Sequence, residues 1–200
     1  MEPELTHIAN IIRRGGVVAW PTDTTWGLLA ACDQPAAVSR IYQIKGRPPD
    51  KPLQILAADV DAAARLVARA ARDRRWLTLS RRFWPGALTL VAPAAAGAPP
   101  ALVSAGKVGL RVPDDPELRE LLRELGGYLA ATSLNRSGQP PVTGYREALE
   151  FAGEVDYIRP GHAGKTASTV YELPESRLLR RGGVSAAAIA AALEEAWTNA

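Results

Sequence analysis

The sequence predicts an α/β protein built around one twisted sheet. Short apolar segments, typical of buried strands, alternate with longer segments that have a helical pattern. Glycine, proline and capping residues stand at the boundaries between these segments. Helices that lie between strands favour a layered domain in which helices pack on a sheet. A length of 200 residues suits one domain, so we expect residues 1–200 to form a single domain.

The strands are predicted from apolar runs bounded by turn residues. The first run, residues 16–20, follows Gly15 and ends at Pro21. The segment 92–101 is rich in Ala and Pro and is expected to be a loop, because a strand pattern resumes directly after it. The predicted strands cover residues 16–20, 53–57, 87–92, 108–112, 128–132, 155–159, 168–173 and 177–181.

The helices are predicted from capping residues followed by apolar periodicity. Asp33 is the expected N-cap of a helix over residues 35–46, with Pro35 in its first turn. An alanine-rich helix is expected from Asp59 to about residue 75. Asp115 caps a helix over residues 116–125, which Gly126-Gly127 closes, and Ser185 caps a final helix over residues 185–197.

Composition excludes several classes of protein. Hydrophobic residues make up 47% and charged residues 22% of the chain, which argues against wholesale disorder. Cys32 is the single cysteine, so the sequence has no disulfide framework and no cysteine-based zinc site. We therefore expect a reducing, cytoplasmic setting. The acidic N-terminus lacks the apolar region of a signal peptide, and no apolar run reaches the ~18 residues of a membrane span.

Basic residues gather in one segment. The net charge is +3, from 24 basic and 21 acidic residues. Between residues 65 and 82, seven arginines are accompanied by one acidic residue, Asp73. Such a segment attracts phosphate groups of a nucleotide or a nucleic acid, or it is a solvated helix face. The arginines are Arg65, Arg69, Arg72, Arg74, Arg75, Arg81 and Arg82.

Common catalytic motifs are missing from the sequence. It contains no G-x-S-x-G, H-E-x-x-H or G-x-G-x-x-G motif. The segment 161–166 ends in Gly-Lys-Thr, but Arg159 stands where a Walker A loop requires glycine. The two histidines are too few for a histidine-based metal triad, and we name no protein ligand for a metal.

Polar clusters at the ends of predicted strands are the candidate site. Residues 21–28 place three threonines and Asp23 directly after the first strand, either at a pocket rim or in a capped turn. Residues 45–53 hold three cations among three prolines, which favours a stiff anion-binding loop over a solvated turn. Arg111 lies inside an apolar strand, so it is either ion-paired within the fold or an anchor for a ligand carboxylate. Residues 133–138 follow another strand, where ligands bind in open α/β sheets.

Taken in order, these motifs resemble the YrdC-type threonylcarbamoyl-AMP synthase family. The resemblance runs from about Gly15 to Val184 and rests on PTDTTWGL, IYQIKGRPPDKPL, FWPGALTLV, VGLRVP, SLNRSGQPP, STV and LLRRGGV. It implies a twisted, mixed, open sheet flanked by helices, with a concave basic face. It also implies that L-threonine, bicarbonate and ATP, with Mg²⁺, yield threonylcarbamoyl-AMP and pyrophosphate. Partner proteins then transfer the threonylcarbamoyl group to the adenosine beside the anticodon of tRNA.

The resemblance also implies roles for individual residues. Lys45 and Arg47 fill the family's Lys-x-Arg motif, and Lys51 fills the basic position before Pro-Leu, so these three are the expected catalytic cations around the triphosphate. Thr24, Arg111, Ser133 and Ser168 match positions on the threonine side. The expected ATP-binding residues are Arg47, Lys51, Asn135, Thr143 and Arg180.

The sequence departs from the family pattern at three positions that bear on pocket shape. Trp26 replaces the usual tyrosine, Leu134 replaces an alanine, and Leu56 stands where some relatives have a polar side chain. The longer relatives carry a second C-terminal domain, and this chain ends about where their first domain does. Residues 92–107 or the C-terminal tail are candidate lids that would keep water from a short-lived carbamate.

Two alternatives remain open at the level of sequence. One is a paralogue that binds double-stranded RNA, tRNA or ribosomal intermediates through its basic face and has no synthase activity. The other is a carbamoyl-handling relative with a different acceptor. Full retention of the Lys-x-Arg and Ser-x-Asn motifs argues against a protein that only binds RNA.

Overall fold

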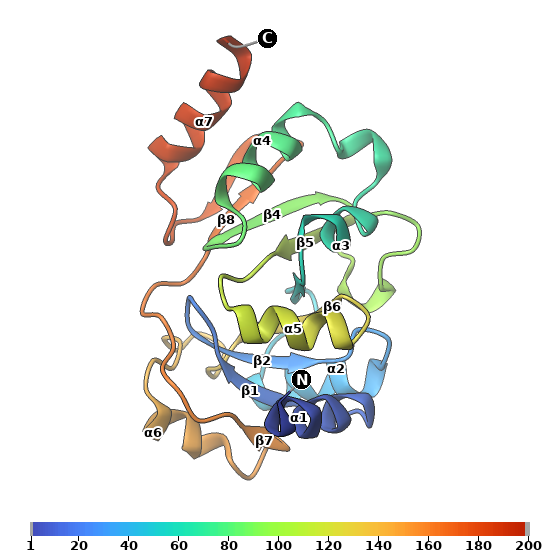
Figure 1. Ribbon diagram of the computed structural model, residues 1–200, viewed down its shortest axis with the longest axis vertical. Coiled ribbons are helices and arrows are strands. Elements are labelled where there is room, and N and C mark those ends of the chain that lie inside the picture. The colour runs from blue at the N-terminus through green and yellow to red at the C-terminus, as the bar shows by residue number, and fades with distance from the viewer. Residues whose placement is uncertain (1, 199–200) are drawn as a thin grey trace.

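The structure, a computed structural model, describes residues 2–198 and arranges them around one nine-stranded sheet (Figure 1). Its strands are β1 (Val18–Pro21), β2 (Trp26–Ala30), β3 (Gln54–Ala57), β4 (Leu88–Pro93), β5 (Lys107–Arg111), β6 (Tyr128–Ser133), β7 (Tyr157–Ile158), β8 (Thr169–Glu172) and β9 (Arg177–Arg180). Their order across the sheet is β7-β1-β2-β6-β3-β5-β4-β8-β9. The pairs β1–β7, β3–β5 and β4–β8 are parallel and the others are antiparallel. The sheet is therefore mixed and open, which confirms the fold class predicted from the sequence.

The α-helices within residues 2–198 are α1 (Pro3–Arg13), α2 (Pro35–Lys45), α3 (Val60–Arg65), α4 (Arg74–Phe83), α5 (Pro116–Glu124), α6 (Tyr145–Ala148) and α7 (Ala186–Thr198). Asp115 and Ser185 cap α5 and α7 by accepting a hydrogen bond from a first-turn N–H, as predicted, and Asp59 caps α3 in the same way. Within the described residues, no helix has both the length and the apolar character needed to cross a membrane.

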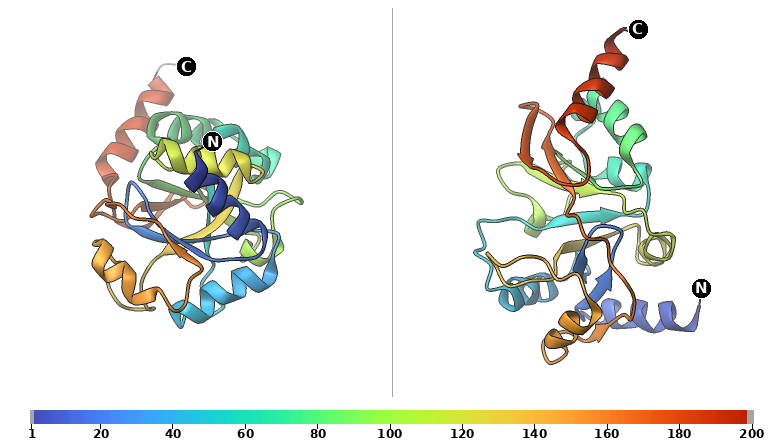
Figure 2. Two further views of the ribbon diagram at one scale, coloured as in Figure 1. Left: turned by 60° about the horizontal axis from the view of Figure 1, so that its bottom comes forward. Right: turned by 90° about the vertical axis from the view of Figure 1, so that its left-hand side faces the viewer.

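Strand alternation directs neighbouring side chains into two separate hydrophobic clusters. Ile55 and Ala57 of β3 belong to the larger cluster, to which α2, α3 and α4 also contribute. Leu56, between them, belongs to a smaller cluster with α1 and α5, which lie side by side (Figure 2). This smaller cluster draws its strand residues from β1, β2, β3 and β6 and takes none from β4, β5 or β8. The same face of the sheet is therefore left uncovered over β4, β5 and β8.

The helix predicted from Asp59 to about residue 75 is wrong, because the structure divides that segment. Helix α3 ends at Arg65, a short 3₁₀ turn spans Arg69–Ala71, and α4 starts at Arg74. Between the helices, the Ala68 N–H donates to the carbonyl of Pro93, so the backbone pairs with the end of β4 rather than with its own preceding turn. Alanine content favours a helix locally, but this tertiary pairing outweighs it.

Three smaller expectations also need correction. Asp33 does not cap α2: the residue before the helix is Gln34, whose side chain instead donates to the carbonyl of Arg13. The strand predicted over residues 155–159 shrinks to Tyr157–Ile158. The sequence pattern does not predict strand β2, because its five residues are all buried and show no polar alternation after the threonine cluster.

Candidate functional site

A cavity of about 550 Å³ opens on the uncovered part of the sheet. Residues at alternate positions of neighbouring strands form its floor, among them Gln54 of β3, Thr89 of β4 and Gly109 of β5, which contributes backbone only. Four cationic residues and one carboxylate line the cavity: Arg47, Lys107, Arg177, Arg180 and Glu172. The excess of positive charge makes the cavity suited to an anionic ligand.

The turn between β1 and β2 supplies hydroxyl groups at one end of the cavity. Thr22 Oγ1 accepts hydrogen bonds from the N–H groups of Thr24 and Thr25, at 3.1 and 3.3 Å, and lies 3.0 Å from Thr24 Oγ1. Both Thr24 and Thr25 line the cavity. The polar cluster at residues 21–28 is thus a capped turn that also borders a pocket.

A second segment holds this turn in place. The N–H of Gly164 donates to the carbonyl of Thr22 at 3.0 Å, and a Cβ atom at position 164 would lie 2.1 Å from the carbonyl oxygen of Asp23. Only glycine allows this close backbone approach. The segment then continues to Ser168, which lines the cavity.

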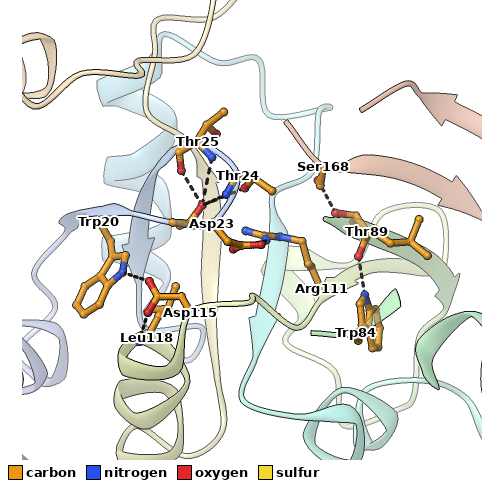
Figure 3. A network of polar contacts seen from close by, with 12 residues as sticks. Trp20, Asp23, Thr24, Thr25, Trp84, Thr89, Arg111, Asp115, Leu118 and Ser168 are labelled. Atoms are coloured by element: carbon orange, nitrogen blue, oxygen red, sulfur yellow. Dashed lines mark hydrogen bonds and ion pairs between the residues drawn. The ribbon is translucent and has the colours of Figure 1, made fainter. Parts of the chain in front are cut away.

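Arg111 is buried behind the turn and paired with Asp23 (Figure 3). Its Nη1 donates to Asp23 Oδ1 and Oδ2 at 2.8 and 3.0 Å, and 1% of the residue is exposed. Arg111 Nε is buried without a partner among the described residues. The structure therefore shows the ion-paired arrangement that the sequence left as one of two possibilities, and Arg111 itself does not line the cavity.

Ser168 lies at the centre of a chain of hydrogen bonds on the cavity floor. Its Oγ lies 2.8 Å from Thr89 Oγ1, which donates to Gln54 Oε1 at 2.9 Å. Arg180 donates to the carbonyl and to Oγ of Ser168, at 2.9 and 3.0 Å. Desolvation, with Arg111 and Arg47 nearby, lowers the pKa of Arg180 from its usual value. Figure 3 shows Arg111 between the threonine turn and the Thr89–Ser168 pair.

Lys45 ties the end of α2 to the loop after β6. Its Nζ donates to the carbonyl of Ser133 at 2.5 Å, to the carbonyl of Asn135 at 3.0 Å and to Asn135 Oδ1 at 2.6 Å. Ser133 Oγ donates to the same Oδ1 at 2.6 Å. Burial, and then the charge of Arg47, lower the pKa of Lys45 to about 7. The three acceptors on Ser133 and Asn135 match the three protons of the Lys45 ammonium group.

The loop after α2 turns back so that Arg47 lines the cavity. Gly46 has a φ of +56°, which places it in the left-handed region that favours glycine, and the N–H of Arg47 donates to the carbonyl of Tyr42. The Arg47 guanidinium donates to the carbonyls of Lys51 and Pro52, at 2.9 and 3.0 Å. Burial lowers the pKa of Arg47 from its usual value. Lys51 is exposed and is not part of the cavity lining.

The structure brings together some of the sequence-predicted site residues and sets others apart. Of that set, Thr24, Arg47, Ser133, Ser168 and Arg180 line the cavity. Those that do not are Lys45, Lys51, Arg111, Asn135 and Thr143. Thr143 is exposed, and its backbone N–H donates to Glu147 at 3.2 Å.

Sequence reasoning missed a second charged end of the cavity. Lys107 and Arg177 line it there together with Glu172, to which both donate. It also missed Gln54 and Thr89 on the floor. The signal that would have found them is periodic: Thr89, Gly109 and Glu172 sit at positions that alternate with buried apolar residues of β4, β5 and β8.

The three departures from the family pattern all lie in the core. Trp26 and Leu134 belong to the larger hydrophobic cluster, and Leu56 belongs to the smaller one. The Trp26 ring stacks on Tyr145 at a centroid distance of 6.0 Å. None of the three lines the cavity, so any effect on the pocket passes through packing.

The open α/β sheet carries a cation-lined cavity with a hydroxyl-bearing floor, an arrangement suited to a small anionic ligand. Residues 10–182 match the Sua5/YciO/YrdC family, described as telomere recombination, and the chain belongs to that family. The resemblance seen in the motifs is thereby confirmed.

Two curated relatives carry the name threonylcarbamoyl-AMP synthase. The Bacillus subtilis protein is 38% identical over 193 residues, which are 92% of this chain and 55% of that protein. The Nitrosococcus oceani protein is 39% identical over 162 residues, which are 80% of this chain and 86% of that protein. Among solved structures, Pyrococcus abyssi Sua5 complexed with L-threonine matches with a TM-score of 0.89 and 34% identity, covering 96% of this chain and 58% of that one. This chain thus spans little more than half of two of these relatives and most of the third.

Proposed function

We propose that this protein is a threonylcarbamoyl-AMP synthase, a nucleotidyltransferase that uses L-threonine, bicarbonate and ATP. The product threonylcarbamoyl-AMP, released with pyrophosphate, serves the threonylcarbamoyladenosine modification of tRNA beside the anticodon, with partner proteins in the transfer step. The observation that carries the proposal is the cavity, which combines the hydroxyls of Thr24, Ser133 and Ser168 with the cations Arg47 and Arg180. Two observations support it: relatives are named threonylcarbamoyl-AMP synthase, and residues 2–198 are organised around one sheet.

The threonine end of the site is proposed at the hydroxyl groups. Thr24 and Ser168 are both buried, so a ligand hydroxyl or ammonium group placed there meets partners that are shielded from water. Arg111 is proposed to act through Asp23, because their ion pair fixes the turn that carries Thr24. Ser133 completes this end from the neighbouring strand.

The ATP end is proposed around Arg47, Lys51 and Arg180. Arg47 and Arg180 line the cavity and have their pKa values lowered by desolvation, which marks them as cations without enough anionic partners in the protein. A triphosphate supplies the missing negative charge. Asn135 and Thr143 are proposed to border the nucleotide. Lys45 is proposed to hold Ser133 and Asn135 in position, and it meets a phosphate only by releasing one of its present acceptors.

The chemistry requires no protein nucleophile. The amine of threonine and bicarbonate form a carbamate, and water leaves. A carbamate oxygen then attacks the α-phosphorus of ATP, the bond to the β-phosphate bridging oxygen breaks, and pyrophosphate departs with the bonding electrons. The protein contributes by aligning the two reactants and by neutralising charge on the phosphates with Arg47, Lys51 and Arg180.

Magnesium is proposed to accompany ATP rather than to reside in the protein. Across residues 2–198, no group of three or more His, Cys, Asp and Glu side chains is arranged to hold a metal ion. Glu172, which lines the cavity, is committed to Lys107 and Arg177, and Asp23, which precedes the cavity-lining Thr24, is committed to Arg111. The residues present therefore do not fit a resident metal, and the ATP phosphates would hold the ion.

The test is pyrophosphate release from ATP in the presence of bicarbonate, with and without L-threonine. We expect release to depend on threonine and to be accompanied by threonylcarbamoyl-AMP, identified by mass spectrometry. A protein that only binds RNA would release none. A relative with another acceptor would release pyrophosphate from ATP in the presence of that acceptor and not of threonine.

A further inference from the structure

The end of the cavity away from Ser168 contains a buried carboxylate, Glu172. It is 5% exposed, yet it lines the cavity and accepts hydrogen bonds from two cations. Lys107 Nζ donates to its Oε1 at 2.9 Å, and Arg177 Nη2 and Nε donate to its Oε2 at 2.7 and 3.0 Å. Hydrogen bonding from Lys107 is the main cause that lowers the pKa of Glu172. The two ion pairs of Glu172 hold both cations beside the cavity.

The strand register places this charged end far from the proposed threonine end. Ser168 directly precedes β8, and Glu172, four residues later, is the last residue of that strand. In β5, Lys107 is the first residue and Arg111, four residues later, is the last. Four residues of extended strand span roughly 13 Å. One cavity thus has two polar ends, whose backbone positions lie roughly 13 Å apart along the strands.

Both cations keep donors that the protein does not use. Glu172 and Glu175 take two of the three protons on Lys107 Nζ, and Arg177 Nη1 has no hydrogen-bond partner among the described residues. The Arg177 side chain is 64% exposed although its partner Glu172 is buried, so the guanidinium is open to a ligand that enters from solvent. A buried carboxylate that aligns two partly free cations at a cavity wall fits the recognition of an oxyanion.

We infer that Glu172 is a positioning residue that holds Lys107 and Arg177 as a phosphate-binding pair at this end of the cavity. The inference rests on the proposed function, in which a nucleotide enters the cavity and pyrophosphate leaves it. The ligand is a phosphate group, belonging either to the terminal phosphates that depart as pyrophosphate or to the phosphate that stays with the adenylate.

The test compares Glu172→Gln with a matched control, Glu175→Gln. Both remove one negative charge next to Lys107, but Glu175 is exposed and does not line the cavity. Affinities for pyrophosphate, AMP and L-threonine are measured by calorimetry. Because Glu172→Gln makes the cavity more positive, simple electrostatics predicts tighter anion binding. Positioning predicts the opposite, a loss of about tenfold with threonine affinity unchanged, while the control stays within about twofold of wild type.

The three ligands separate the possible outcomes. A loss confined to pyrophosphate assigns the pair to the departing phosphates, and a loss confined to AMP assigns it to the adenylate phosphate. Unchanged or tighter binding of both overturns the inference. Glu172→Asp should bind the phosphate ligand more tightly than Glu172→Gln does. If the two variants have the same thermal stability, a role of Glu172 in folding alone would not explain that difference.

Variants of the two cations provide a second test. If Glu172→Gln does not fold, Lys107→Met and Arg177→Met replace it, and each should weaken the binding of one of the two phosphate ligands. Normal binding of both ligands by both variants overturns the inference. Because binding requires no turnover, a wild-type protein that binds pyrophosphate but makes no threonylcarbamoyl-AMP would contradict the proposed function and leave this inference standing.

Discussion

Arg180 donates hydrogen bonds to both the carbonyl oxygen and the Oγ of Ser168, at 2.9 and 3.0 Å. The sequence motifs assign the two residues to different substrates, Arg180 to the nucleotide and Ser168 to the amino acid. Their direct contact means that the two proposed subsites share a wall. A change at one residue is therefore transmitted to the other.

Arg180→Ala should weaken the binding of both ATP and threonine, by about tenfold or more for ATP and by less for threonine. The reason is that the variant removes a charge-assisted hydrogen bond and also frees the Ser168 hydroxyl. Calorimetry with each ligand measures the two effects. Arg181→Ala is the matched control, because Arg181 is exposed and does not line the cavity. A loss for ATP with threonine binding untouched would show that the subsites are independent.

Lys45→Met should lower the free energy of unfolding at pH 7 by about 1–3 kcal/mol, because three acceptors on Ser133 and Asn135 lose their donor. Urea titration measures the change. Leu77→Ala, on an exposed side chain, is the control for a surface truncation. Stability equal to wild type would show that water replaces the ammonium at no cost.

The stability difference between wild type and Lys45→Met should also depend on pH. The pKa of Lys45 is lowered to about 7 in the folded state, whereas an unfolded lysine titrates near 10.4. Between these values the unfolded chain holds a proton that the folded protein has released, so wild type gains stability relative to the variant as pH rises, by at most about 1.4 kcal/mol per pH unit. Urea titrations of both proteins at pH 6, 7, 8 and 9 test this. A constant difference would show that Lys45 stays charged throughout.

Asp23→Asn should destabilise the protein by about 3–5 kcal/mol, because it leaves the buried Arg111 without its counter-ion. The turn that carries Thr24 should also loosen, and threonine affinity should fall. Thermal unfolding and calorimetry at a temperature where the variant is folded measure these effects. Asp114→Asn is the control, since Asp114 is exposed. A stable variant that binds threonine normally would remove the positioning role proposed for the pair.

Serine should be a poor but detectable substrate, and valine should be far worse. Serine lacks one methyl group, worth ~1 kcal/mol in a fitted pocket, whereas valine lacks the hydroxyl that would hydrogen-bond with the buried side chains of Thr24 and Ser168. Calorimetry with the three amino acids in the presence of ATP compares them. Valine that binds as tightly as threonine would refute the assignment of the threonine end.

Neutralising surface arginines tests whether they contact nucleic acid without taking part in the proposed synthesis. Arg72 and Arg75 are already engaged, with the carbonyl of Val67 and with Asp73, so a clean test uses Arg69, Arg81 and Arg82. These three are exposed and do not line the cavity. The triple alanine variant should keep the proposed synthase activity. If these arginines contact RNA, the slope of log RNA affinity against log salt should fall by about 0.7–0.9 for each RNA phosphate that the variant no longer neutralises. Abolished synthesis with unchanged RNA affinity would place these arginines in the site.

The sequence by itself determined the local elements and the chemical character of the site. Proline and capping residues fixed the start of α5 at Pro116 after Asp115, because such signals act within one turn. The motifs likewise placed Arg47, Ser133, Ser168 and Arg180 in one site, since each lies in a motif shared with a family.

Only the tertiary structure decided which of these groups are free to meet a ligand. Lys45, Arg47 and Arg111 all donate to acceptors within the fold, but only Arg47 among these three lines the cavity. The charged end around Glu172 arises from β8 and its neighbours, and the split of residues 59–75 arises from pairing with the end of β4. These outcomes depend on interactions between residues far apart in sequence, and no local propensity encodes the register that sets such interactions.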